Sequence, residues 1–139
     1  MNRDSVTAKG ADLDLTAEIN DRLRITGSVG YLDASVSDGT RLEGRPEWKG
    51  GATLSWQPAE HVLVSVHGKV NGSFYDAAVP TGVVLLDGYT RIDASVRWDM
   101  TDNIDMKLLL TNALDRGYQE AVGFSNAGRQ IRLALGARL

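Results

Sequence analysis

The chain has 139 residues with 15 Lys+Arg against 18 Asp+Glu, a net charge of -3, so it lacks the basic excess typical of nucleic-acid-binding proteins. A hydrophobic content of 42% excludes an intrinsically disordered segment, and the absence of cysteine excludes disulfides, thiol catalysis and thiolate metal sites. The length suits a single domain, and there is no run of about 18 apolar residues that would predict a transmembrane helix.

Alternation of apolar and polar residues recurs along the whole chain and predicts strands rather than helices. In chain order, the expected strands are 11–19, 23–31, 49–56, 62–75, 91–99, 104–111 and 131–139. The sequence therefore predicts an all-β fold, an antiparallel meander of about seven strands.

The connections between these strands alternate in length. Short, turn-like segments at 20–21, 57–60 and 101–102 alternate with long segments at 33–46, 76–88 and 113–128. In a meander, this alternation places all long connections at one end of the sheet. Short turns at one end and long loops at the other are typical of a transmembrane β-barrel.

Aromatic residues on the apolar face give an independent indication. Trp56 and Trp98 precede short turns, whereas Tyr31, Trp48 and Phe74 lie near the long connections. Eight residues of strand separate Trp48 from Trp56, about 27 Å of rise, which a strand tilt of about 40° reduces to nearly the ~25 Å apolar band of a barrel. We expect these five rings to lie at membrane interfaces; the alternative is that they fill a sandwich core at unrelated heights.

The opposite face of the expected strands is rich in charge of both signs. It carries Arg22, Arg24, Lys49, Lys69, Arg91, Asp93, Arg97, Asp105, Lys107, Arg132 and Arg138. These side chains would line a hydrated lumen, although a soluble sheet could expose them equally.

Seven antiparallel strands also cannot close as one antiparallel ladder, so both edges would stay open unless residues 3–9 add a strand or another chain completes the wall.

Four short motifs resemble one known family. Leu86–Asp93 reads LDGYTRID and is similar to the "GYxxxDLxxxY" strand of TonB-dependent outer-membrane receptors, and Asn112–Tyr118 reads NALDRGY and resembles their "NLxDxxY" element. Gly128-Arg129 resembles the "PGR" that opens the last strand, and Arg45-Pro46 resembles the "RxP" before a descending strand. Each motif is short, but the resemblance covers nearly the whole chain and the combination is specific.

The resemblance implies that residues 1–139 are a single barrel segment, the C-terminal third of a 22-stranded transmembrane β-barrel, with neither plug domain nor TonB box. It implies a location in the Gram-negative outer membrane and a transport role for the parent receptor, importing a scarce nutrient such as a siderophore or cobalamin. The implied partners are outer-membrane lipid and the remainder of the barrel with its plug, or copies of this chain. TonB would act only indirectly, and neither a cofactor nor nucleic acid is expected.

Candidate chemical sites are few. Tyr75, Tyr118 and Phe124, in or beside the long connections, could contact a ligand at the outer mouth, with loop packing as the alternative. Ser65 and His67 lie two apart on one strand without an orienting acid, so we expect no catalytic site and no enzyme. Loop aspartates lack Ca²⁺-loop spacing and suit turns, so we expect no metal site: Asp33, Asp38, Asp76 and Asp87.

Two other functions stay open at this point. A small soluble binding barrel of lipocalin type would turn the apolar face inward and the charged face to water. A separately encoded set of strands could instead complete the barrel of another chain. A requirement for detergent would distinguish the membrane proteins from the soluble barrel.

Overall fold

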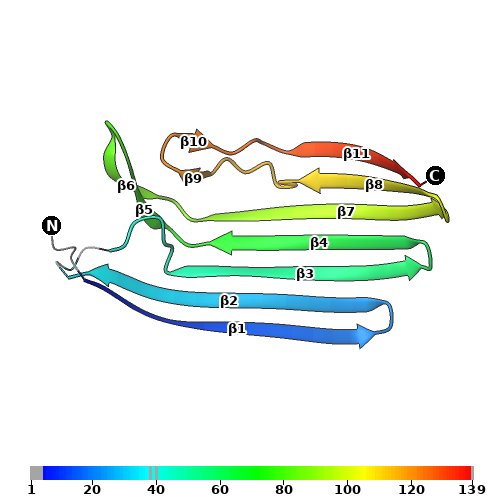
Figure 1. Cartoon of the computed structure of the whole chain (residues 1–139), viewed down its shortest axis with the longest axis horizontal. Coiled ribbons are helices and arrows are strands. Elements are labelled where there is room, and N and C mark those ends of the chain that lie inside the picture. The colour runs from blue at the N-terminus through cyan, green and yellow to red at the C-terminus, as the bar shows by residue number, and fades with distance from the viewer. Residues whose placement is uncertain (1–4, 38, 40, 139) are drawn as a thin grey trace.

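The computed structural model describes residues 5–37, 39 and 41–138. Seven strands form one antiparallel sheet in the order β1-β2-β3-β4-β7-β8-β11 (Figure 1). Their bounds are β1 Val6–Asn20, β2 Leu23–Val36, β3 Trp48–Ala59, β4 Val62–Asn71, β7 Tyr89–Thr101, β8 Ile104–Thr111 and β11 Gln130–Ala137. Two hairpins lie at one end, β5 (Phe74–Ala78) with β6 (Gly82–Leu86), and β9 (Gln119–Ala121) with β10 (Phe124–Ser125). The predicted all-β antiparallel meander of seven strands is confirmed.

The expected fourth strand, 62–75, is wrong in its extent. β4 ends at Asn71, and the chain leaves the sheet at Gly72 before β5 begins at Phe74. The backbone amide of Gly72 donates to the carbonyl oxygen of Trp48 at 2.8 Å, and a Cβ on Gly72 would lie 3.2 Å from that oxygen. This close backbone approach suits glycine, and alternation of side chains cannot reveal it.

Other boundaries differ in smaller ways. β1 begins at Val6, so the described part of 3–9 extends the first strand and adds no further one. β3 runs to Ala59 through an irregularity in its pairing with β4. The long connections 76–88 and 113–128 contain the two hairpins, and Asp38 and Leu139 lie outside the described residues.

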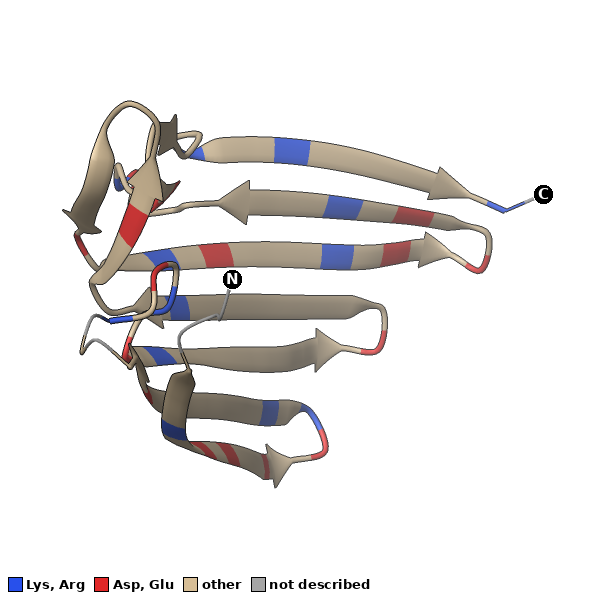
Figure 2. Ribbon diagram, turned by 60° about the vertical axis from the view of Figure 1, so that its left-hand side comes forward, with Lys and Arg blue, Asp and Glu red and all other residues tan. Residues whose placement is uncertain are grey.

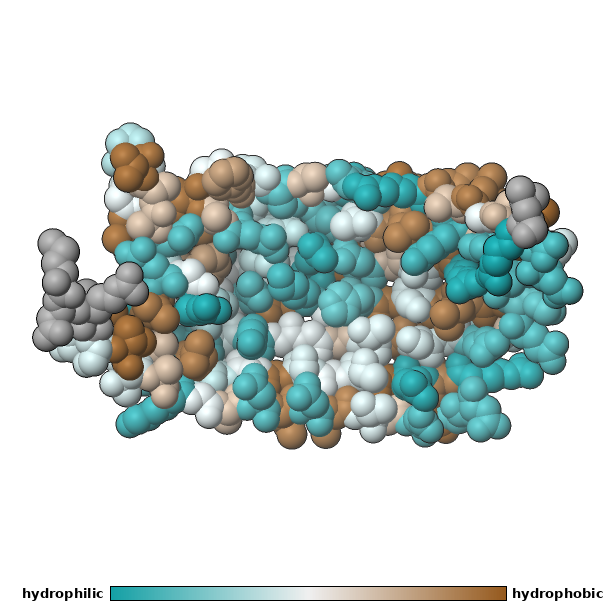
Figure 3. Space-filling model, in the orientation of Figure 1, coloured by the Kyte–Doolittle hydropathy of each residue, from teal (hydrophilic) through white to brown (hydrophobic). Residues whose placement is uncertain are grey.

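The register assigns one polarity to each face of the sheet. Across the ladders, apolar positions pair with apolar ones, as in the rows Ile25–Leu54–Val66 and Val96–Leu108–Leu133. We call this side the apolar face and the other the polar face. Figure 3 shows the polar face, on which hydrophilic residues cover most of the sheet. The described residues contain no helix long and apolar enough to span a membrane.

This single-layer sheet has no core of its own. Leu15 on β1 and Leu133 on β11 are 64% and 63% exposed, and many other large apolar side chains of the apolar face are exposed too. The buried hydrophobic side chains among the described residues are Ala34, Phe74, Leu86 and Tyr89. All four lie at the end of the sheet that carries the hairpins, which we call the loop end; the opposite end is the turn end (Figure 1).

Both edges of the sheet are unpaired within the described part of the chain. β1 and β11 stand at opposite ends of the strand order. β1 starts at the loop end and β11 finishes at the turn end, as expected for an odd number of antiparallel strands (Figure 1).

Candidate functional site

The polar face carries its densest set of contacts at the loop end, where β4, β7 and the β9 hairpin meet. Register places Lys69 of β4 opposite Arg91 of β7, and Asn71 opposite Tyr89. Segment 118–120 lies over these two strands and adds Tyr118 and Glu120. We call Lys69, Tyr89, Arg91, Tyr118 and Glu120 the wall cluster.

Stacking and hydrogen bonds hold the wall cluster together. The rings of Tyr89 and Tyr118 stack with centroids 4.0 Å apart and planes inclined by 12°. The Tyr89 hydroxyl donates to Glu120 Oε1 at 2.6 Å, and Lys69 Nζ lies 3.3 Å from the same oxygen. Arg91 Nη1 donates to the Tyr118 hydroxyl at 3.3 Å. The Tyr118 hydroxyl and the Glu120 carboxylate therefore each bond to side chains of the sheet.

Each cation of the wall cluster has an acidic partner, in the cluster or beside it on β7. Arg91 pairs with Asp93 through Nη2 and Oδ2 at 2.8 Å, while Lys69 pairs with Glu120. The hydrogen bond from Tyr89 holds the pKa of the Glu120 carboxyl below its ordinary value of 4.5. The Lys69 ammonium acts in the same direction, and the partial burial of Glu120 acts in the opposite one. Glu120 is therefore the anion that compensates Lys69.

Asn112 anchors the connection from which this segment projects. Its side chain is 1% exposed and donates through Nδ2 to the carbonyl oxygen of Arg116 at 2.9 Å, while its Oδ1 accepts the Arg116 amide at 3.2 Å. The Asn112 amide donates to Asp93 Oδ1 at 2.9 Å. Asn112 and Asp115 both have φ 51°, a left-handed conformation that Asn and Asp tolerate better than most residues. The NALDRGY motif thus forms a tight loop on the sheet.

A groove opens at the same end, between the β2–β3 connection and the β5–β6 hairpin. It has a volume of about 550 Å³ and is lined by Val36, Arg41, Leu42, Glu43, Tyr75 and Val83. Arg41 Nη1 is paired with Glu47 Oε1 at 2.8 Å, so the guanidinium already has a partner. The walls are mainly apolar.

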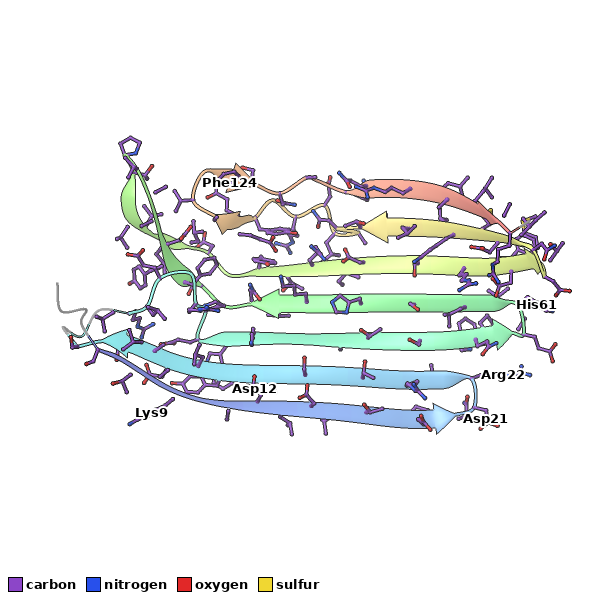
Figure 4. All side chains as sticks on the ribbon, in the orientation of Figure 1. Lys9, Asp12, Asp21, Arg22, His61 and Phe124 are labelled. Carbon is purple, nitrogen blue, oxygen red and sulfur yellow. The ribbon has the colours of Figure 1, made fainter. Side chains whose placement is uncertain are left out.

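The three aromatic residues expected to contact a ligand lie in different surroundings. Tyr75 lines the groove, and Tyr118 stacks on Tyr89 in the wall cluster. Phe124 is 74% exposed on β10 (Figure 4). The structure does not gather them into one site, and a ligand role for each stays a prediction. Sequence reasoning missed Tyr89 and Glu120, although Tyr89 belongs to the LDGYTRID motif.

Four of the five rings expected at membrane interfaces lie on the apolar face of the sheet, and their place at an interface stays a prediction. Trp48, Trp56 and Trp98 are 55%, 47% and 43% exposed, and Tyr31 packs beside Trp48 with ring centroids 4.7 Å apart. Phe74 differs. It is 6% exposed, because the chain has left the sheet after Gly72 and the ring lines a small cavity at the loop end, so it is not exposed on the apolar face.

Beyond Tyr31 the two faces exchange polarity. On β2, Asp33 and Ser35 continue the apolar face, whereas Leu32, Ala34 and Val36 continue the polar face. Leu32 and Ala34 line a small cavity together with Phe74. The apolar face therefore ends at Tyr31, and the buried cluster at the loop end begins there.

Charged side chains of the polar face lie toward both ends of β7 (Figure 2). At the turn end, Arg97 Nε donates to Asp99 Oδ1 at 2.9 Å. Serine and threonine residues occupy the middle rows: Thr26, Thr53, Ser55, Ser65 and Ser95. His67 Nδ1 lies 2.8 Å from Thr53 Oγ1 rather than pairing with Ser65. Among the described residues, no group of three or more His, Asp or Glu is placed to hold a metal ion.

Comparisons with known proteins agree with this geometry. Residues 1–113 match the family model described as TonB dependent receptor-like, beta-barrel. The chain is 30% identical over 112 residues to the vitamin B12 transporter BtuB of Vibrio cholerae serotype O1, an alignment that covers 78% of this chain and 18% of the transporter.

Solved structures share the fold. The ferric-catecholate import receptor Fiu of E. coli K12 superposes with a TM-score of 0.80 at 19% identity, covering 95% of this chain and 21% of that one. The pyoverdine outer membrane receptor FpvA of Pseudomonas aeruginosa PAO1 gives a TM-score of 0.79 at 14% identity, covering 96% of this chain and 22% of that one. The chain thus spans about a fifth of the length of these relatives.

Proposed function

Because the chain belongs to the TonB-dependent receptor β-barrel family, we propose that it forms part of the wall of an outer-membrane barrel that imports a scarce nutrient such as a siderophore or cobalamin. Its relatives support an uptake role and a non-enzymatic function, since they are named as a transporter and an import receptor. The proposed location is the outer membrane of a Gram-negative bacterium.

One observation carries this proposal: between the Tyr31–Trp48 pair and the turn end, seven strands in register present an apolar surface on one side and a polar surface, with charges of both signs, on the other. A soluble barrel of lipocalin type would close this sheet and bury the apolar face. The described strands leave both edges open and the apolar side chains exposed. In lipid, those side chains contact hydrocarbon, and neighbouring strands must satisfy the backbone groups of β1 and β11.

The aromatic rings supply the proposed limits of the hydrocarbon region. Tyr31 and Trp48 would lie at the outer interface, and Trp56 and Trp98 at the inner one. The exchange of polarity beyond Tyr31 supports the outer limit, because Asp33 would leave the hydrocarbon at that point. Residues at the loop end would then face the exterior.

The proposed partners are lipid on the apolar face, and strands of a larger barrel or copies of this chain at the edges. The polar face would line the lumen and contact a plug domain of the parent receptor. The membrane-facing part of this proposal can be tested with single-tryptophan variants in bilayers that carry brominated lipids.

When Trp48 or Trp56 is kept as the only tryptophan, its fluorescence should be quenched most by bromines near the headgroups. A Leu54→Trp variant that lacks the native tryptophans should be quenched most by bromines deep in the acyl chains. Equal quenching of all three single-tryptophan variants at every bromine depth would contradict the proposed orientation. A chain that stays folded and monodisperse without detergent or lipid would contradict membrane residence.

A further inference from the structure

The two hairpins at the loop end are each too small to be stable alone. β5 and β6 have five residues each, and β9 and β10 have three and two. Both hairpins form sheets separate from the seven-stranded one. Isolated two-stranded hairpins are marginal at best in water, so their positions depend on side-chain contacts.

The β9 hairpin is held on the sheet by the wall cluster. Its contacts are the stack of Tyr118 on Tyr89, the hydrogen bond from Arg91 to the Tyr118 hydroxyl, and the bonds of Glu120 to Tyr89 and Lys69. The side chains of Lys69 and Glu120 are 35% and 56% exposed, so their ion pair lies at the solvent boundary. Exposed ion pairs contribute little to stability, so this contact can break and form again.

The β9 hairpin is also tied to the β5–β6 hairpin. The backbone amide of Val122 donates to Asp76 Oδ2 at 2.7 Å, across 46 positions of sequence. The β5–β6 hairpin is tied in turn to the β2–β3 connection, since the Gly44 amide donates to the carbonyl oxygen of Tyr75 at 2.7 Å. The β9 hairpin is therefore linked to the sheet and to the β5–β6 hairpin, and the β5–β6 hairpin is linked to the β2–β3 connection.

We propose that β9 is a latch: Tyr118 and Glu120 close it on the sheet, and Asp76 couples its opening to that of the β5–β6 hairpin. When the contacts to Tyr89 and Lys69 break, the β9 hairpin moves away from the sheet and the β5–β6 hairpin loosens with it, while the buried Phe74 and Leu86 keep the base of β5–β6 packed. This inference depends on contacts at the loop end alone and does not rest on the proposed membrane function.

Hydrogen exchange of the full chain, in the detergent and assembly in which it is isolated, tests the coupling. The latch variant combines Tyr118→Leu with Glu120→Gln, and exchange is followed in peptides from 119–125, from 74–86 and from β4. We expect exchange to rise about tenfold in both hairpin peptides, since a charge-assisted hydrogen bond and a stacked pair are lost, and to stay unchanged in β4.

Asp76→Ala isolates the coupling. In an Asp76→Ala background, the latch substitutions should still raise exchange in 119–125 but should add nothing in 74–86. Glu60→Gln, the same chemical change at the turn end, should leave both hairpins unchanged. The proposal is overturned if the latch variant affects 119–125 alone while Asp76 is present, or affects neither hairpin, or if Glu60→Gln gives the same result as the latch variant.

Discussion

Tyr31 of β2 pairs with Trp48 of β3, with ring centroids 4.7 Å apart, and the two faces of the sheet exchange polarity at this pair. On one side of the pair, the apolar face continues to Trp56. On the other side, the row of Lys9 and Asp33 replaces apolar residues with charges. This pair separates a surface suited to lipid from an end that packs against its own loops.

Acidification should open the latch only below the ordinary titration range of glutamate. The pKa of Glu120 is lower in the folded state than in the unfolded one, because Tyr89 donates to it and Lys69 attracts it. Its stabilising contribution is therefore complete above the ordinary pKa of 4.5 and is lost as pH falls through the lower folded value. Exchange at 119–125, corrected for intrinsic rates, should stay constant from about pH 7 to pH 5 and rise only as pH falls below 4.5.

Glu120→Gln should remove this dependence on pH, because the amide does not titrate. A rise in exchange between pH 7 and 5 that persists in Glu120→Gln would show that another group controls the latch.

Asn112→Ala should destabilise the loop end more than Asn112→Gly does. Both substitutions remove the side chain that bonds the Arg116 backbone, at a cost of about 1–3 kcal/mol for the groups left unpaired. Alanine adds about 1 kcal/mol, because φ is 51° at this position and glycine adopts that conformation freely. Urea unfolding in detergent measures the difference, and equal stability of the two variants would contradict the role of φ.

Arginine should be tolerated on one face of β4 and not on the other. Val66 lies midway along β4 on the apolar face, and Val66→Arg should cost about 2–4 kcal/mol of folding free energy in lipid, as expected near a bilayer midplane. Ser65→Arg places the same side chain on the polar face, one residue away, and should cost under about 1 kcal/mol. Equal costs in reversible folding into vesicles would contradict the assignment of the faces.

The edges of the sheet should pair with strands outside this seven-stranded set. Leu15→Cys on β1 and Leu133→Cys on β11 introduce the two cysteines of an otherwise cysteine-free chain. Each should crosslink to a different chain or to the rest of a barrel, since an unpaired backbone group in hydrocarbon costs several kcal/mol. A disulfide between them within one monomer would show that the sheet closes by itself.

Alternation in the sequence was sufficient to predict the sheet, because a sheet with one apolar side repeats every second residue along each strand. It could not predict that the fourth strand ends at Asn71, since the alternation continues through Gly72 to Phe74 and does not mark where the backbone leaves the sheet. The same limit explains the burial of Phe74, whose place in the alternation continues the apolar face of β4.

The wall cluster was harder to predict than the sheet. Lys69 and Arg91 were recognisable as polar-face charges, but their partners Tyr118 and Glu120 come from a connection that shows no alternation. The bond between Asp76 and Val122 joins two such connections. Contacts of this kind depend on how the loops fold back, which local sequence does not specify.

Labelling of single cysteines along β3 in intact outer membranes tests the central claim most directly. Ala52→Cys and Leu54→Cys on the apolar face should resist a charged maleimide, because the reagent does not enter hydrocarbon and a thiol there stays protonated and unreactive. Thr53→Cys and Ser55→Cys represent the polar face and should react with the charged reagent once the membrane is permeabilised. Gly51, also on the polar face, is left unchanged because a Cβ there would lie 3.2 Å from the carbonyl oxygen of Gly68. Reaction that alternates with every residue is the predicted result, and equal reaction of all four positions with the charged reagent would contradict a wall that faces lipid on one side.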